Sequence, residues 1–169
     1  MRALTLLLVL IFPLSAQAES YCSGMNMPTA TLTYISRGFS DGHTGLDLMA
    51  PRGSPIRAAA GGTVIFAGWY FDYGNIVDIK HADGVITRYA HMLAFARGIG
   101  EGTPVSAGKV IGQVGATGRA HGPHVHFEVR LDGHPVDPRP YLGLSPCTNL
   151  IDREPIEEAR SQEPKRRHP

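Results

Sequence analysis

Short runs in which apolar and polar residues alternate fill the middle of the chain, between Tyr34 and Leu142. A period of two places every second side chain on the same face of a strand, whereas a helix repeats near every 3.6 residues. The alternation predicts strands over residues 63–67, 75–80, 85–91, 110–114 and 124–130. Asp83-Gly84 stands between two of these runs, which is typical of a β-hairpin turn.

Glycine and proline separate these runs. All 20 glycines lie between Gly24 and Gly143, and the chain also has 13 prolines. This frequency excludes a long helix or coiled coil, and the lack of a Gly-x-y repeat excludes collagen. Residues 54–60 and 93–97 are the two candidates for short helices. We expect an all-β fold, an antiparallel two-sheet sandwich or open barrel of short strands, with glycine-rich loops as the walls of a groove.

The two ends differ from this middle part. Arg2 precedes an apolar run at residues 4–14, and Ala16-Gln17-Ala18 forms a small-x-small cleavage site. This pattern predicts a secretory signal peptide over residues 1–18. A membrane span needs about 20 apolar residues, so an uncleaved anchor is the weaker interpretation and we expect no span in the mature chain. Residues 151–169 carry five acidic and five basic side chains and almost no apolar ones, which predicts a charged, disordered tail.

Export agrees with the two cysteines, Cys22 and Cys147, which lie near the ends of an expected domain over residues 19–150. An oxidising compartment permits a disulfide between them, and two free buried thiols are the alternative. The chain carries 16 basic and 15 acidic residues, so loss of Arg2 with the signal peptide leaves no net charge. This balance, with 43% apolar residues, favours a packed domain and no nucleic-acid partner.

Histidines carry the chemical signal of the sequence. His124 and His126 are two residues apart on an expected strand, so their imidazoles project from the same face. His43 and Asp47 flank Gly45, whose lack of a Cβ lets a tight turn aim both side chains at one point. Two neutral imidazoles and a carboxylate, with one position left for water, are typical of catalytic zinc.

Two further residues belong to this pattern. His91 ends another expected strand, and Glu128 shares the face of the H-x-H pair as a rival ligand or as an outer hydrogen-bond acceptor. The remaining histidines have no such spacing, and we assign them no chemistry: His81, His121, His134 and His168.

Other active-site motifs are absent from the sequence. It has no H-E-x-x-H, no G-x-S-x-G turn and no phosphate-binding loop. Two histidines and a carboxylate also occur in non-haem iron oxygenases, although their usual H-x-D spacing is missing here. An H-x-H pair could bind copper together with Met25, Met27 or Met92. These two metalloprotein classes are the alternatives to zinc.

The motifs stand in a distinctive order between Gly38 and Leu142. The H-x3-D turn is followed by Ala-Pro-Arg-Gly-Ser-Pro-Ile, Tyr-Gly-Asn, Thr-Arg-Tyr-Ala-His and Gly-Pro-His-Val-His-Phe-Glu, which begin at residues 50, 73, 87 and 122. In order and spacing the chain resembles the lysostaphin/LytM-type zinc endopeptidases, which cut peptidoglycan cross-links and have a duplicated hybrid motif β domain. The segment between Phe39 and His43 is shorter than in many relatives, which leaves the shape of one groove wall open.

The resemblance implies a role for each motif residue. His43, Asp47 and His126 would ligate one Zn²⁺ per chain, and His91 and His124 would form the catalytic pair beside it. The implied function is that of an exported zinc metallo-endopeptidase, periplasmic or extracellular, that hydrolyses peptide cross-links between the stems of bacterial peptidoglycan with a metal-activated water. We expect a monomer. A non-catalytic LytM-like module that binds or regulates a cell-wall hydrolase is the alternative.

Overall fold

The computed structural model describes residues 24–146, which contain eleven strands and one short 3-10 helix but no α-helix. The elements are β1 (Tyr34–Arg37), β2 (Leu46–Met49), β3 (Pro55–Arg57), β4 (Gly62–Trp69), η1 (Phe71–Tyr73), β5 (Asn75–Lys80), β6 (Ile86–Ala90), β7 (Ala94–Phe95), β8 (Pro104–Val105), β9 (Val110–Gln113), β10 (His124–Leu131) and β11 (His134–Val136). Within this range no helix is long and apolar enough to cross a membrane.

Some sequence predictions concern other parts of the chain. The expected signal peptide at 1–18, the charged tail at 151–169 and both cysteines, Cys22 and Cys147, lie outside the described residues. They stay predictions.

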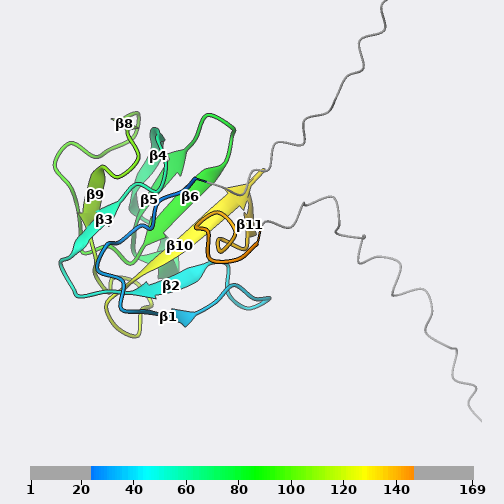
Figure 1. Ribbon diagram of the computed structural model, residues 1–169. Coiled ribbons are helices and arrows are strands. Elements are labelled where there is room, and N and C mark those ends of the chain that lie inside the picture. Colours follow the sequence, from blue (N-terminus) through cyan, green and yellow to red (C-terminus); the bar gives the residue numbers. More distant parts are fainter. Residues whose placement is uncertain (1–23, 147–169) are drawn as a thin grey trace, which may run out of the picture.

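Eight strands form one antiparallel sheet in the order β1-β2-β10-β6-β5-β4-β8, with β11 paired to β10. Figure 1 shows β10 between β2 and β6, in the middle of this sheet. A second antiparallel sheet has the order β3-β9-β7. The large sheet begins at β1 and ends at β8, so it does not close into a barrel. The expected all-β fold of two antiparallel sheets is confirmed.

Both sheets contribute to one apolar core, because alternate residues of each strand point toward it. The core side chains include Leu46, Leu48, Tyr89 and Phe127 from the large sheet and Ile56 and Ile111 from the small one, all fully buried. Burying an aliphatic or aromatic side chain of this size contributes about 1.5–3 kcal/mol. The intervening residues of β2 and β10 project from the opposite face, where polar side chains gather.

The long strands lie where the alternation predicts them. Predicted strand 63–67 corresponds to β4, which is longer by one residue at its start and two at its end, and 124–130 corresponds to β10, which is longer by one residue. The Asp83-Gly84 turn joins β5 to β6: the Val85 N–H donates to the Asp83 carboxylate over 3.1 Å, and Gly84 has a φ of +84° that a glycine adopts without strain.

The two candidate helices were wrong. Residues 54–60 contain β3, and residues 93–97 contain β7. In β3 only the middle residue, Ile56, is buried, which is the alternation of a strand. Both segments pair with β9, so long-range sheet pairing overrides the weak local preference of these short runs.

Candidate metal centre

Three neighbouring strands bring the predicted site residues together. Asp47 on β2 lies directly opposite His126 on β10, and Ala90 at the end of β6 lies opposite His126 on the other side. His91 therefore follows immediately after the residue that pairs with His126. Residues two apart on a strand share a face, so His124 and Glu128 project on the same side as His126. The register of three strands thus assembles a cluster from segments far apart in the sequence.

His43 reaches this cluster from a tight turn before β2. The backbone N–H groups of Ser40 and His43 each donate to the other's carbonyl, over 3.0 and 2.9 Å. Gly45 then passes so close to β10 that a Cβ there would lie 2.3 Å from the Phe127 carbonyl oxygen. Only glycine fits this approach. The expectation that Gly45 lets His43 and Asp47 point at one spot agrees with this geometry, although the reason is close packing and not a positive φ.

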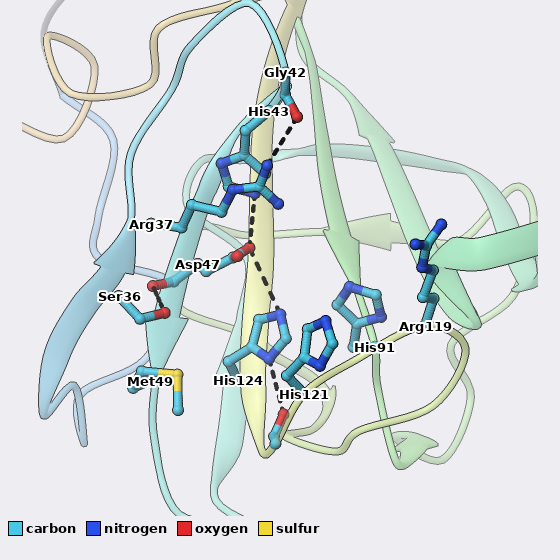
Figure 2. A pocket seen from close by; sticks show the side chains of 11 residues that line it. Ser36, Arg37, Gly42, His43, Asp47, Met49, His91, Arg119, His121 and His124 are labelled. Atoms are coloured by element: carbon cyan, nitrogen blue, oxygen red, sulfur yellow. Dashed lines mark hydrogen bonds and ion pairs between the residues drawn. The ribbon is translucent and has the colours of Figure 1, made fainter.

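Three ligand atoms converge at the centre of the cluster. The Asp47 Oδ1 atom lies 3.0 Å from the His43 Nε2 atom and 2.8 Å from the His126 Nδ1 atom, and these two nitrogens are 3.1 Å apart. The two imidazoles are buried, and Asp47 is 15% exposed. Figure 2 shows His43 and Asp47 pointing at one another from the turn and from β2.

The outward nitrogens show which ring atoms carry protons. The His43 Nδ1–H donates to the Gly38 carbonyl over 2.8 Å, and the His126 Nε2–H donates to the Glu128 carboxylate over 3.1 Å. A carbonyl oxygen only accepts, so the proton of a neutral His43 ring is on Nδ1. The His126 ring faces a carboxylate on each side, and with its proton on Nε2 its Nδ1 atom presents a lone pair beside that of the His43 Nε2 atom. Two lone pairs and one carboxylate oxygen then face one point, an arrangement that suits a cation.

This donor set fits zinc. Ligand atoms held roughly 2.0–2.2 Å from a tetrahedral ion lie about 3.3 Å from one another, close to the spacing of these three atoms. His43, Asp47 and His126 also form the one group of three or more ligand-type side chains that could hold a metal in the part of the chain that the structure describes. Two imidazoles and one carboxylate leave a position for water or substrate.

His91 and His124 form a second pair beside these three residues. Their ring centroids are 4.7 Å apart. The His91 Nδ1–H donates to the Thr117 carbonyl and the His124 Nδ1–H to the Gly122 carbonyl, each over 2.8 Å. Each ring therefore keeps an unprotonated Nε2 atom, and that of His124 lies 3.6 Å from the Asp47 carboxylate.

The backbone at His91 is held in an unusual conformation. Its φ of +59° is in the left-handed region, where a residue with a Cβ costs on the order of 1–3 kcal/mol. The His91 N–H donates to the Tyr73 carbonyl over 2.9 Å, which helps to keep the turn in place. Strained backbone of this kind is common at functional sites, and it persists only where the surrounding contacts hold it in place.

Burial and neighbouring charges shift the pKa values in the cluster. Burial, together with the nearby His124 and His126, lowers the pKa of His91 to about 4 despite its bond to Thr117, so this imidazole is neutral near pH 7. Burial alone would raise the pKa of Asp47, but the hydrogen bond from His126 and the neighbouring imidazoles outweigh it and lower it. Asp47 is therefore ionised.

His126 shows the opposite shift. Burial alone would lower its pKa, but the hydrogen bonds with Asp47 and Glu128 and their charges raise it. Burial would raise the pKa of Glu128, yet the hydrogen bonds from His126, Thr44 and Tyr73 lower it to about 2. An imidazole held between two carboxylates shows that the site attracts positive charge.

A cavity of about 650 Å³ opens above the cluster. Figure 2 shows Arg37 of β1 and Arg119 of the loop before β10 on opposite sides of the histidines. Arg37 donates to the Gly42 carbonyl over 3.0 Å, and Arg119 lies 3.8 Å from the Asp72 carboxylate with both side chains exposed. Sequence reasoning did not identify these arginines, since neither belongs to a motif with a chemical spacing.

The other histidines of the described residues differ in their burial and contacts. His81 is a buried structural residue whose ring nitrogens contact the Gly61 carbonyl and the Thr87 hydroxyl at 2.8 and 2.9 Å. His121 and His134 are both exposed, and His121 lines the cavity. His168 lies outside the described residues.

The chain is similar to curated and solved peptidases. It is 52% identical over 96 residues to the "DD-carboxypeptidase/endopeptidase Mpg" of Neisseria meningitidis, covering 57% of this chain and 22% of that protein. A "zinc containing peptidase" from Vibrio cholerae superposes with a TM-score of 0.63 at 33% identity, over 68% of this chain and 39% of that one. The catalytic domain of lysostaphin from Staphylococcus simulans superposes with a TM-score of 0.57 at 30% identity, over 65% of this chain and 90% of that one.

The curated relative is much longer than the matching region, because this chain spans only about a fifth of its length. The family model described as "Peptidase family M23" matches residues 41–138, which include all five motif residues and every strand from β2 to β11. The resemblance to lysostaphin/LytM-type enzymes is thereby confirmed. This chain belongs to peptidase family M23.

Proposed function

We propose that the protein is a zinc metallo-endopeptidase that hydrolyses peptide cross-links of bacterial peptidoglycan. One observation carries this proposal: two imidazole lone pairs and a carboxylate oxygen meet within 3.1 Å, at the base of a cavity that also contains a second histidine pair. Membership of a peptidase family supports hydrolysis of peptide bonds. The names of the Neisseria and Vibrio proteins support an endopeptidase activity and zinc.

His43, Asp47 and His126 would hold one zinc ion. Bound there, zinc would act as a Lewis acid and lower the pKa of water toward about 7. Two of these side chains are anchored by a second contact, and the third stands on a paired strand. His43 is held by the Gly38 carbonyl and His126 by Glu128. Asp47 is held by its strand pairing with His126.

His91 and His124 would handle protons during peptide hydrolysis. Both present an unprotonated Nε2 atom beside the ligand cluster, and both are held there by backbone carbonyls. One ring can take a proton from the attacking water on its Nε2 atom, and the imidazolium so formed can donate a hydrogen bond to the tetrahedral oxyanion and pass the proton to the leaving amine. We assign these steps to the pair and not to one residue.

The cavity walls suit an anionic peptide. Arg37 and Arg119 both line the cavity, and guanidinium groups bind carboxylates with paired hydrogen bonds. The peptide stems of peptidoglycan carry free carboxylates, so such a substrate would match these walls. An extended peptide could lie between them with its scissile carbonyl above the ligand cluster.

The wider organisation completes the proposal. We propose a signal peptide at residues 1–18, a peptidase domain at 19–150 with its motif-bearing core at 38–142, and a charged tail at 151–169. A Cys22–Cys147 disulfide would form after export to the periplasm or the exterior. We propose that the domain acts as a monomer, with no nucleic-acid partner.

Digestion of defined muropeptides tests the activity. The zinc-loaded protein is incubated with cross-linked muropeptide dimers, and new peptide ends are identified by mass spectrometry. We expect cleavage by the wild type and a loss of at least about 10³-fold for His91→Ala and for His124→Ala, a size typical of removing proton transfer and oxyanion stabilisation together. A zinc-loaded wild-type protein that produces no new ends would overturn the enzyme proposal and favour the non-catalytic binding module.

A further inference from the structure

Glu128 is a fully buried carboxylate, 0% exposed, on the face of β10 that carries the site. Its Oε1 atom accepts hydrogen bonds from the Thr44 hydroxyl at 2.5 Å, the Tyr73 hydroxyl at 2.8 Å and the His126 Nε2–H at 3.1 Å. Its Oε2 atom accepts a short bond from the Arg130 guanidinium. Both oxygens of this carboxylate are therefore used inside the protein.

This arrangement sets His126 apart from the other three histidines of the site. Backbone carbonyls orient His43, His91 and His124, and no side-chain substitution removes a carbonyl. His126 is oriented by a side chain instead. The ring of His126 can therefore be released by a single substitution.

The proton position on His126 follows from its partner. The ring lies between two carboxylates, Glu128 at Nε2 and Asp47 at Nδ1. A cation held by Asp47 needs the Nδ1 lone pair, so the proton of the neutral ring then belongs on Nε2, where Glu128 accepts it. Without that acceptor the proton can move to Nδ1, and the lone pair then points away from the cluster. Histidine ligands commonly have an outer partner of this type.

Thr44 and Tyr73 keep the carboxylate itself in place. Thr44 follows His43 in the turn before β2, and Tyr73 is the last residue of η1. The two hydroxyl groups that donate to Glu128 therefore come from separate segments of the chain. The Thr44 and Tyr73 hydroxyls also lie 3.2 Å apart, within hydrogen-bond distance. A carboxylate excluded from water is stable only when such donors surround it.

We propose that Glu128 is a positioning residue, which holds His126 with its Nε2 atom protonated and its Nδ1 atom presented beside His43 and Asp47. Thr44 and Tyr73 fix Glu128 for this task. The inference rests on the proposed zinc site. It concerns the state of one imidazole ring, so its test is separate from the test of peptide cleavage.

The test compares Glu128→Gln and Glu128→Ala with the wild type. Imidazole nitrogens are observed by ¹⁵N NMR at mildly alkaline pH, with and without zinc, and the zinc dissociation constant is measured by competition with a fluorescent chelator. In the wild type we expect His126 to carry its proton on Nε2 in both states. In the variants we expect zinc to bind about 10–100-fold more weakly, the usual loss for an outer ligand partner, and the Nε2–H signal to broaden or move.

Asp78→Asn is the matched control. Asp78 is another buried carboxylate on the same face of the sheet, and its hydrogen bonds over 2.7 and 2.8 Å both come from Arg88. We expect this variant to keep wild-type zinc affinity within about twofold and an unchanged His126 signal. Equal losses of zinc affinity in Asp78→Asn and Glu128→Gln would overturn the proposal, since they would indicate a general loss of packing.

If the Glu128 variants do not fold, Tyr73→Phe tests the proposal instead. It removes one donor from the carboxylate without touching His126, and we expect a smaller loss of zinc affinity, about threefold to tenfold. A wild-type zinc affinity in folded Tyr73→Phe and Glu128→Gln, or a wild-type ring protonated on Nδ1, would contradict the proposal. If the wild type binds no zinc, the zinc proposal fails while the metal-free spectrum still decides the role of Glu128.

Discussion

At the scale of single residues, the site depends on one missing side chain. Gly45 stands between His43 and Asp47, and its backbone passes against the Phe127 carbonyl. A methyl group there would meet a backbone atom of the central strand, which cannot rotate away as a flexible side chain could. The turn that carries two of the three ligand residues is therefore docked directly on the strand that carries the third.

We expect Gly45→Ala to destabilise the fold by about 1–3 kcal/mol, the usual cost of forcing an atom into packed structure. Gly42→Ala in the same turn is the control, because a Cβ there meets nothing within 4 Å, and we expect a change below about 0.5 kcal/mol. Urea denaturation followed by circular dichroism measures both. Equal stability of the two variants would show that the turn is not held against β10.

Tyr89 gives a stability prediction at alkaline pH. Its hydroxyl is buried and accepts from the Ala59 N–H and the Thr87 hydroxyl, and burial raises its pKa to about 12. An unfolded tyrosine ionises near pH 10, so the folded state keeps its proton over a range in which the unfolded state loses it. This contribution to stability is complete below about pH 10 and is lost as the pH rises to about 12, which amounts to at most ~2.7 kcal/mol.

Urea denaturation at a series of pH values measures this effect. We expect the wild-type free energy of unfolding to fall more steeply between about pH 10 and 12 than that of Tyr89→Phe, which has no phenol to ionise. Parallel curves for the two proteins would contradict the raised pKa.

At the scale of strands, the period-two pattern predicted most of the fold. It also predicted that His124 and His126 share a face, because that follows from strand geometry alone. The pairing of His126 with Asp47 and the position of His91 beside it were not predictable in this way, since register is set by contacts between distant segments. β3 and β7 were missed because runs of two or three residues carry too little pattern.

Other features of the site could also not be predicted from the alternation of apolar and polar residues. The left-handed backbone of His91 has no sequence signal, as residues other than glycine only occasionally adopt it. Glu128 was recognised as sharing the site face, but its choice between ligand and outer acceptor needed coordinates. The family motifs supplied the grouping of His43, Asp47 and His126, which no spacing rule could have provided.

Buried and exposed apolar residues of the large sheet should respond differently to substitution. Phe127 is fully buried in the core, so we expect Phe127→Ala to cost about 3–5 kcal/mol of stability. On β4, Ile65 is 37% exposed, and we expect Ile65→Ala to cost less than about 1 kcal/mol. Thermal unfolding of both variants tests this. A small effect of Phe127→Ala would show that the core is not centred on this strand.

At the scale of the whole molecule, the cavity walls should select substrates by charge. We expect Arg37→Ala and Arg119→Ala each to raise KM about fivefold to thirtyfold for muropeptides with free carboxylates, with kcat little changed, because each removes about 1–2 kcal/mol of a charge-assisted contact. For substrates whose carboxylates are amidated, we expect the variants and the wild type to have the same KM. Arg139→Ala, which removes an exposed arginine paired with Asp137, is the control. A raised KM that is independent of substrate charge would contradict the role of these arginines.

Zinc content of purified variants tests the central claim most directly. Substitution of a ligand residue should lower the zinc content, whereas substitution of a proton-transfer residue should not, because only the ligand residues would hold the ion. By elemental analysis after chelator-free purification, we predict about one zinc per chain in the wild type and in His91→Ala, and less than about a tenth of that in Asp47→Ala, which loses the only carboxylate ligand. A wild type without zinc, or an Asp47→Ala variant with a full equivalent, would contradict the account.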